Sequence, residues 1–99
     1  MAQPVSWKVI EHGWRVVAVG GEEVGTIHEV VGDEGADIFN GLAVSPGFLQ
    51  NSRYVPSEDV GEIVDGEVRL RLAKEQFGQL EAWHGTPRSA RLDSDTTHL

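Results

Sequence analysis

Asp59-Val-Gly-Glu-Ile-Val-Asp-Gly-Glu-Val-Arg-Leu-Arg-Leu72 is the stretch of sequence that decides the fold. Its centre, Asp65-Gly66, is a dipeptide favoured in two-residue type I′ turns, whose twist matches that of the strands they join. A turn there pairs Val64 with Glu67, Ile63 with Val68, Glu62 with Arg69 and Gly61 with Leu70. In this register Ile63, Val68, Leu70 and Leu72 point inward, while Glu62 and Arg69 form an opposite-charge pair outside. The stretch therefore predicts a β-hairpin, because a slip of one residue would bury both charges.

Further strands are expected on the N-terminal side of this hairpin. Short segments rich in β-branched and other apolar residues, separated by Gly, Pro and Asp, cover residues 14–19, 24–31, 36–44 and 53–55. In the third segment Ile38, Asn40, Leu42 and Val44 share the side with the larger aliphatic residues, which we expect to face the core. Mixed apolarity in residues 24–31 suggests a bulge or a covering layer. Residues 5–10 are expected to form either a short strand or a plug over one end of the fold.

The sequence changes its periodicity after Leu72. Ala73, Phe77, Leu80 and Trp83 lie on one helical stripe, so residues 73–83 are expected to form a closing helix, weakened by Gly78. Ser57-Glu-Asp59 is expected to form a single helical turn. The fold class expected is mainly β: a small, highly twisted antiparallel β-barrel of about six strands with a C-terminal helix. Residues 1–84 would form the domain, and the polar residues 85–99 a flexible tail.

Composition restricts the classes of partner. The 99 residues contain no Cys, and 8 Lys and Arg against 16 Asp and Glu give a formal net charge of −8. The segment Glu22–Asp37 holds six carboxylates and neither Lys nor Arg. Because nucleic-acid binding draws on cations, direct binding to nucleic acid is not expected. No apolar run is long enough for a membrane span or a signal sequence, so we expect a cytoplasmic protein without membrane insertion.

The sequence contains no pattern typical of catalysis or metal binding. His12, His28, His84 and His98 are scattered, and none has the spacing that places two imidazoles on one helical face. Residues 33–37 cluster carboxylates around Gly35 but lack the ligand order of a calcium loop, which favours a solvated turn. No Ser lies on a strand-to-helix elbow. We therefore expect a protein that is not an enzyme and has no cofactor.

Several aromatic and large apolar residues remain after the core positions are assigned. Aromatic side chains are enriched at the anchors of protein interfaces. A small barrel also needs side chains that cover its open ends. The same residues can fill this role, as can Trp7 and Trp14. The residues that we expect at a partner interface, if they are not part of the core, are Phe39, Phe48, Leu49, Arg53 and Tyr54.

Four segments carry a resemblance to a known family. Gly20-Gly-Glu-Glu-Val-Gly-Thr-Ile27, Asp37-Ile-Phe-Asn-Gly-Leu-Ala-Val44, Tyr54-Val-Pro-Ser-Glu-Asp-Val60 and Ile63-Val-Asp-Gly-Glu-Val-Arg-Leu70 resemble the PRC-barrel superfamily. The superfamily includes the cytoplasmic domain of the photosynthetic reaction-centre H subunit and the C-terminal domain of the ribosome maturation factor RimM. The likeness covers about residues 14–83, and its motifs mark turns and strands rather than chemistry.

The resemblance implies a compact barrel of about six strands used for protein interaction or assembly, with no catalytic residues to carry over. The first hypothesis is a non-enzymatic interaction module that self-associates as a homodimer, in which Phe48→Asp would weaken the contact. The second is a ribosome-maturation or RNA-processing adaptor that binds a ribosomal protein. The third is a small-ligand or ion-binding protein that uses the acidic surface of residues 22–37. Lacking a membrane helix and a separate N-terminal domain, the chain is expected to be closer to small stand-alone members.

Overall fold

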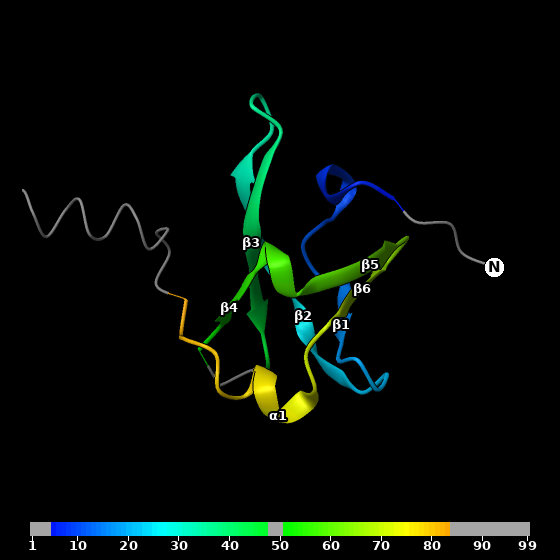
Figure 1. Ribbon diagram of the computed structural model, residues 1–99, viewed down its shortest axis with the longest axis vertical. Coiled ribbons are helices and arrows are strands. Elements are labelled where there is room, and N and C mark those ends of the chain that lie inside the picture. Colours follow the sequence, from blue (N-terminus) through cyan, green and yellow to red (C-terminus); the bar gives the residue numbers. More distant parts are fainter. Residues whose placement is uncertain (1–4, 48–50, 84–99) are drawn as a thin grey trace, which may run out of the picture.

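The computed structural model describes residues 5–47 and 51–83 (Figure 1). Its elements in chain order are a 3-10 turn η1 (Trp7–Val9), strands β1 (Arg15–Val17), β2 (Glu23–Asp33), β3 (Ile38–Ser45) and β4 (Arg53–Pro56), a second 3-10 turn η2 (Ser57–Asp59), strands β5 (Val60–Val64) and β6 (Glu67–Leu70), and a short helix α1 (Lys74–Phe77). The fold is therefore mainly β, as the sequence predicts. No helix among these residues is long and apolar enough to cross a membrane.

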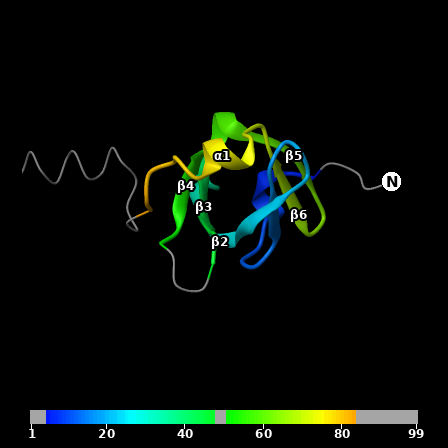
Figure 2. The same cartoon turned by 90° about the horizontal axis from the view of Figure 1, so that it is seen from below.

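The six strands form one sheet in the order β4-β3-β2-β1-β6-β5. Its terminal strands β4 and β5 are not paired with each other in the described part of the chain, so closure into a barrel is not confirmed. The sheet is nevertheless strongly curved: Figure 2 shows β3 and β4 on one side, β5 and β6 on the other, and α1 between them. Curvature of this kind lets one sheet enclose its own core.

The expectation of a wholly antiparallel sheet is wrong at one pair of strands. β1 and β6 run parallel, with Arg15 opposite Glu67 and Val17 opposite Arg69, whereas the other four pairs are antiparallel. Hairpin turns fix the direction of strands that follow one another, but β1 and β6 are separated by four strands. Their relative direction is set by how the sheet curls, which no local turn encodes.

The core lies inside this curved sheet. Its fully buried side chains come from β1, β2, β3, β4 and β6; the largest are Val16, Ile27, Leu42, Val44, Val55 and Val68. Phe77 of α1 is also buried, and Trp7, Phe39 and Leu80 pack against this cluster from its margin. The described residues contain no buried polar or charged residue, so burial of apolar surface is the main stabilising contribution.

The hairpin around Asp65-Gly66 has the predicted register next to the turn. Val64 pairs with Glu67 and Ile63 with Val68, and Gly66 takes a positive φ of 85°. The Glu62 Oε1 lies 2.9 Å from the Arg69 Nη1. Further along, Leu70 pairs with Val60 instead of Gly61, because the register shifts between Val60 and Ile63. Such a bulge places an extra residue in one strand and increases its twist.

The predicted inward face of the third strand is correct only in part. Leu42 and Val44 are fully buried, but Ile38 is 50% exposed, and Phe39 on the other face packs against the core instead. The hairpin of β2 and β3 extends beyond the rest of the sheet at this end (Figure 1), so Ile38 has no core opposite it. Phe39 is covered by Trp7, with ring centroids 5.1 Å apart and planes 14° from parallel.

Short irregular segments precede the first strand and follow the last strand of the sheet. Residues 7–9 form a 3-10 turn, not a strand, and Trp7 packs on the core, so of the two alternatives for residues 5–10 the plug is confirmed. The helix expected over residues 73–83 ends at Phe77. From Glu81 the chain extends along the outer edge of β4, where Tyr54 N–H donates to the Glu81 carbonyl and Trp83 N–H to the Ser52 carbonyl. Unpaired groups on an edge strand attract an extended segment, and here that pairing replaces the helix.

Candidate functional site

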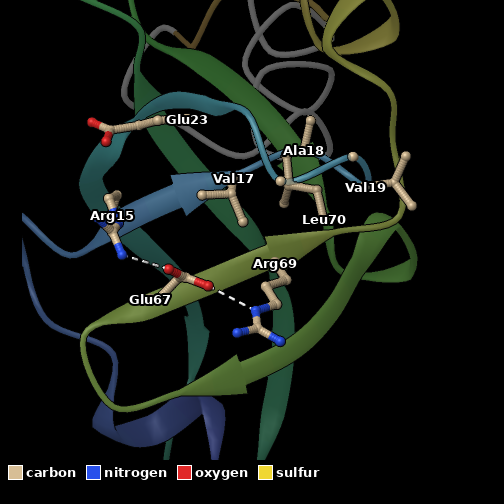
Figure 3. A pocket seen from close by; sticks show the side chains of 10 residues that line it. Arg15, Val17, Ala18, Val19, Glu23, Glu67, Arg69 and Leu70 are labelled. Atoms are coloured by element: carbon tan, nitrogen blue, oxygen red, sulfur yellow. Dashed lines mark hydrogen bonds and ion pairs between the residues drawn. The ribbon is translucent and has the colours of Figure 1, made fainter.

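A cavity of about 590 Å³ lies against β1, β6 and the turn that follows β1 (Figure 3). Val17 and Leu70 contribute apolar surface to it, and Val19 to Gly21 of the turn form one of its sides. Arg15, Glu23, Glu67 and Arg69 supply its charged groups. The cavity therefore combines apolar surface with converging charged groups, the composition typical of recognition sites.

The parallel pairing of β1 and β6 explains why Arg15, Val17, Glu67 and Arg69 share a face. Arg15 lies opposite Glu67 and Val17 opposite Arg69. Since side chains alternate along a strand, the residues between them, Val16 and Val68, point to the other face, where both are fully buried in the core. The same two strands thus supply the core on one side and the cavity on the other.

Glu67 is held between two guanidinium groups. Its carboxylate accepts a hydrogen bond from Arg15 Nη2 at 2.7 Å and another from Arg69 Nε at 2.7 Å. Arg69 also donates from Nη1 to Glu62 at 2.9 Å. The Glu67 side chain is 15% exposed, whereas both arginine side chains are about half exposed. These contacts form a chain of ion pairs from Glu62 through Arg69 and Glu67 to Arg15. They fix the direction of the two arginine side chains at the surface.

These contacts shift the pKa values of the two central groups in opposite directions. The hydrogen bond from Arg69, followed by that from Arg15, lowers the pKa of Glu67 below its ordinary value of 4.5. The hydrogen bond to Glu67 raises the pKa of Arg69. A carboxylate with a lowered pKa is a weak proton acceptor at neutral pH.

Sequence reasoning missed this site. It identified the Glu62–Arg69 pair but could not place Arg15 beside Glu67, because those residues are 52 positions apart and meet through the parallel strand pair. The alternation that places Arg15 and Val17 on one face of β1 was the available signal. An alternating Arg and Val pattern is equally typical of an ordinary solvent-facing strand.

The residues expected at a partner interface lie in different surroundings. Phe39 stacks on Trp7 and covers the core. Arg53 and Tyr54 are consecutive residues of β4 with different partners. Arg53 Nη1 donates to the Leu80 carbonyl at 2.6 Å, and the Tyr54 ring stacks on Trp83 with ring centroids 5.5 Å apart. Phe48 and Leu49 lie outside the described residues. A partner contact through these residues stays a prediction.

The acidic segment Glu22–Asp37 follows β2 and its turn into β3. Its carboxylates are exposed; Asp33 accepts hydrogen bonds from the N–H groups of Gly35 and Ala36, and Asp37 lies 3.3 Å from Lys8. In the part of the chain that the structure describes, no three His, Cys, Asp or Glu side chains gather as metal ligands. The Asp33 contacts are those of a side chain that stabilises its own turn.

Comparison with known proteins assigns the chain to a family. No curated protein matches this sequence. The family model described as the PRC-barrel domain matches residues 12–76, which run from the residues before β1 into α1 and include all six strands. Since this match covers well over half of the sequence, the chain belongs to the PRC-barrel family.

Proposed function

We propose that this PRC-barrel domain is a non-enzymatic protein-interaction module that associates with a second copy of itself through the cavity face of β1 and β6. The observation that carries the proposal is the gathering of Arg15 and Arg69 with Glu67 and Glu23 around apolar Val17 and Leu70. PRC-barrel domains act as interaction modules, and the proposal applies that coarse role to a particular surface.

Charge favours this face over the others. Two copies that each carry a formal charge of −8 repel one another, and cations at a shared contact offset this repulsion. The described residues contain six Lys and Arg: Lys8, Arg15, Arg53, Arg69, Arg71 and Lys74. Two of them, Arg15 and Arg69, line the cavity beside carboxylates. A face with both signs can meet its own copy across a two-fold axis, as an isologous dimer requires.

An exposed apolar side chain beside the cavity adds to this argument. Val19 lies in the turn after β1, lines the cavity and is 66% exposed, the highest value among the three large exposed apolar residues of the described chain. Arginine is enriched at protein interfaces, and an exposed apolar side chain beside it offers surface that a partner can bury.

The experiment is a measurement of oligomeric state by sedimentation equilibrium for the wild-type chain and two matched variants. Val19→Asp introduces a buried charge into the proposed contact and should weaken association at least tenfold. Val9→Asp makes the same change at a valine that is 47% exposed on η1, away from the cavity, and should associate like the wild type. A wild-type chain that stays monomeric at millimolar concentration, or equal losses in both variants, would contradict the proposal.

A second candidate has one observation in its favour. The hairpin of β2 and β3 extends from the sheet (Figure 1) and carries the exposed carboxylates of Glu29, Asp33 and Glu34. Such a surface complements a basic protein, as an adaptor that binds a ribosomal protein would need. Pull-down from the host lysate with and without ribonuclease tests it, since recovery of ribosomal proteins must survive the nuclease.

The small-ligand alternative has less support, because Glu23 is the one residue of 22–37 that lines the cavity.

A further inference from the structure

Two histidines that are far apart in the sequence lie side by side on the surface. The ring centroids of His12 and His28 are 6.2 Å apart, with the ring planes inclined by 59°. Both residues are exposed, and neither ring has a hydrogen bond or ion pair to another described residue. The two imidazoles are thus accessible together, on a face that the sequence pattern did not bring into one site.

The backbone fixes both residues at this position. Gly13 N–H donates to the Ile27 carbonyl at 2.8 Å, and Ile27 N–H donates to the Trp14 carbonyl at 2.8 Å, so the residues before β1 are bonded to the middle of β2. Gly13 has a φ of 90°, which turns the chain directly after His12. Since most side chains avoid this conformation, the turn depends on glycine.

His28 is turned outward by a bulge. Ile27 pairs with Val44 and Glu29 pairs with Ala43, which leaves His28 as the extra residue in β2. Bulges commonly change the direction of a side chain relative to the regular strand. Both histidines therefore stand on well-anchored backbone, so bringing them together for a ligand costs little conformational entropy.

We propose that His12 and His28 form a two-imidazole binding site for a late first-row divalent ion such as Zn²⁺, with the remaining coordination positions open to solvent. An ion bound at about 2.0–2.1 Å to one nitrogen of each ring places the ring centroids roughly 5–6 Å apart. The observed 6.2 Å lies just above this range, and both rings are exposed. Imidazole nitrogen is a favoured ligand for Zn²⁺, Cu²⁺ and Ni²⁺.

The proposal does not depend on self-association and goes beyond the interaction role. No group of three His, Cys, Asp or Glu ligands gathers among the described residues, so this site would have two protein ligands. Protein zinc sites with fewer than three protein ligands leave room for water or for a ligand from another molecule. Binding is therefore expected to be weaker than at a closed structural site.

The test is titration of the full chain with ZnCl₂ by isothermal calorimetry at about pH 7.5, above the ordinary imidazole pKa of about 6.5. We expect one ion per chain, and at least tenfold weaker binding in His12→Gln and in His28→Gln. His98→Gln, which removes a histidine outside the described residues, is the matched control and should bind like the wild type. Side-chain nitrogen NMR should show the resonances of His12 and His28 shifting together.

Two results would overturn the proposal: no binding of Zn²⁺ by the wild-type chain at millimolar concentration, or unchanged binding in both His12→Gln and His28→Gln. Melting curves in the presence of EDTA separate a loss of ligand from a loss of fold, because both variants should then melt with the wild type. With Zn²⁺ added, only the wild type and His98→Gln should gain melting temperature, as expected when a ligand binds the folded state.

Discussion

The side chain of Tyr54 lies over Gly41, although Tyr54 itself pairs with Ala43 and Gly41 pairs with Pro56. A Cβ atom on Gly41 would stand 2.8 Å from the Tyr54 Cζ and hydroxyl oxygen and would also collide with the Val55 carbonyl oxygen. The bare backbone of β3 at this point lets the tyrosine hydroxyl donate to the Asn40 carbonyl at 2.8 Å. Gly41→Ala should therefore lower the free energy of unfolding by about 1–3 kcal/mol, since extra volume in a packed site forces shifts of side chain and backbone.

The matched control for this substitution is Gly35→Ala. Gly35 lies in the exposed turn between β2 and β3, and the atom nearest to its Cβ would be the Asp33 Oδ1 at 3.4 Å. Urea titration of both variants should show a change below about 0.5 kcal/mol for Gly35→Ala. Equal effects of the two substitutions would mean that Tyr54 does not need the space above Gly41.

Phe39 should contribute to the stability of the fold. It stacks on Trp7 and packs against the core cluster. Phe39→Ala is expected to cost about 1–3 kcal/mol, less than the roughly 3–5 kcal/mol typical of a fully buried phenylalanine. A double-mutant cycle with Trp7→Ala should give a coupling of about 0.5–1.5 kcal/mol for the stacked pair. Additive effects would show that the stack with Trp7 does not stabilise the fold, and a loss below about 0.5 kcal/mol for Phe39→Ala would contradict its role in stability.

The Glu67 carboxylate should make stability depend on pH in the acidic range. Its pKa is lowered on folding by Arg69 and Arg15, so its contribution is complete above its ordinary pKa of 4.5 and is lost as the pH falls through the lowered value. Glu67→Gln should therefore be less stable than the wild type at neutral pH, by about 0.2–1 kcal/mol because the pairs are near solvent. The difference should vanish at low pH.

Thermal melting at a series of pH values checks this expectation, with Glu29→Gln as the control. Glu29 is exposed on β2 and makes no ion pair with another described residue. Its substitution should leave the pH dependence of the melting temperature unchanged. A Glu67→Gln difference that persists to low pH would show that the two arginines do not act through the charge of Glu67.

Local features of the fold could be predicted because they depend on residues close in sequence. The Asp65-Gly66 turn, the pairing of Ile63 with Val68 and the turn at Ser57–Asp59 all rest on local preferences that the tertiary structure leaves in place. The bulges in β2 were also suggested by its mixed apolar pattern. The PRC-barrel resemblance, carried by turn and strand motifs, is confirmed by the family match.

Features that depend on distant partners could not be predicted from the pattern. Ile38 was expected inside because its strand alternates, yet the strand extends past the core at that residue. The helix was expected to reach Trp83, yet pairing with Ser52 and Tyr54 on β4 gives residues 81–83 an extended path. Strand pairing across the sheet brings Arg15 close to Glu67 and His12 close to His28. The alternation of side chains along a strand does not specify which strands pair.

The segment that covers the edge of β4 should open without unfolding the rest of the sheet. It is held by two backbone hydrogen bonds, by the bond from Arg53 to the Leu80 carbonyl and by the stack of Trp83 on Tyr54. Trp83→Ala removes the stack, so hydrogen exchange at the Tyr54 amide, which donates to the Glu81 carbonyl, should accelerate at least tenfold while β2 and β3 keep their protection.

Trp83→Phe is the matched variant for this last prediction. The buried Trp83 Nε1 has no hydrogen-bond partner among the described residues, and an unsatisfied buried donor costs about 1–3 kcal/mol. Phenylalanine keeps an aromatic ring against Tyr54 and removes that donor, so protection of the Tyr54 amide should stay equal or rise. Hydrogen exchange followed by NMR measures both variants. Faster exchange in Trp83→Phe as well would contradict the prediction, because it would mean that a phenyl ring does not replace the indole against Tyr54.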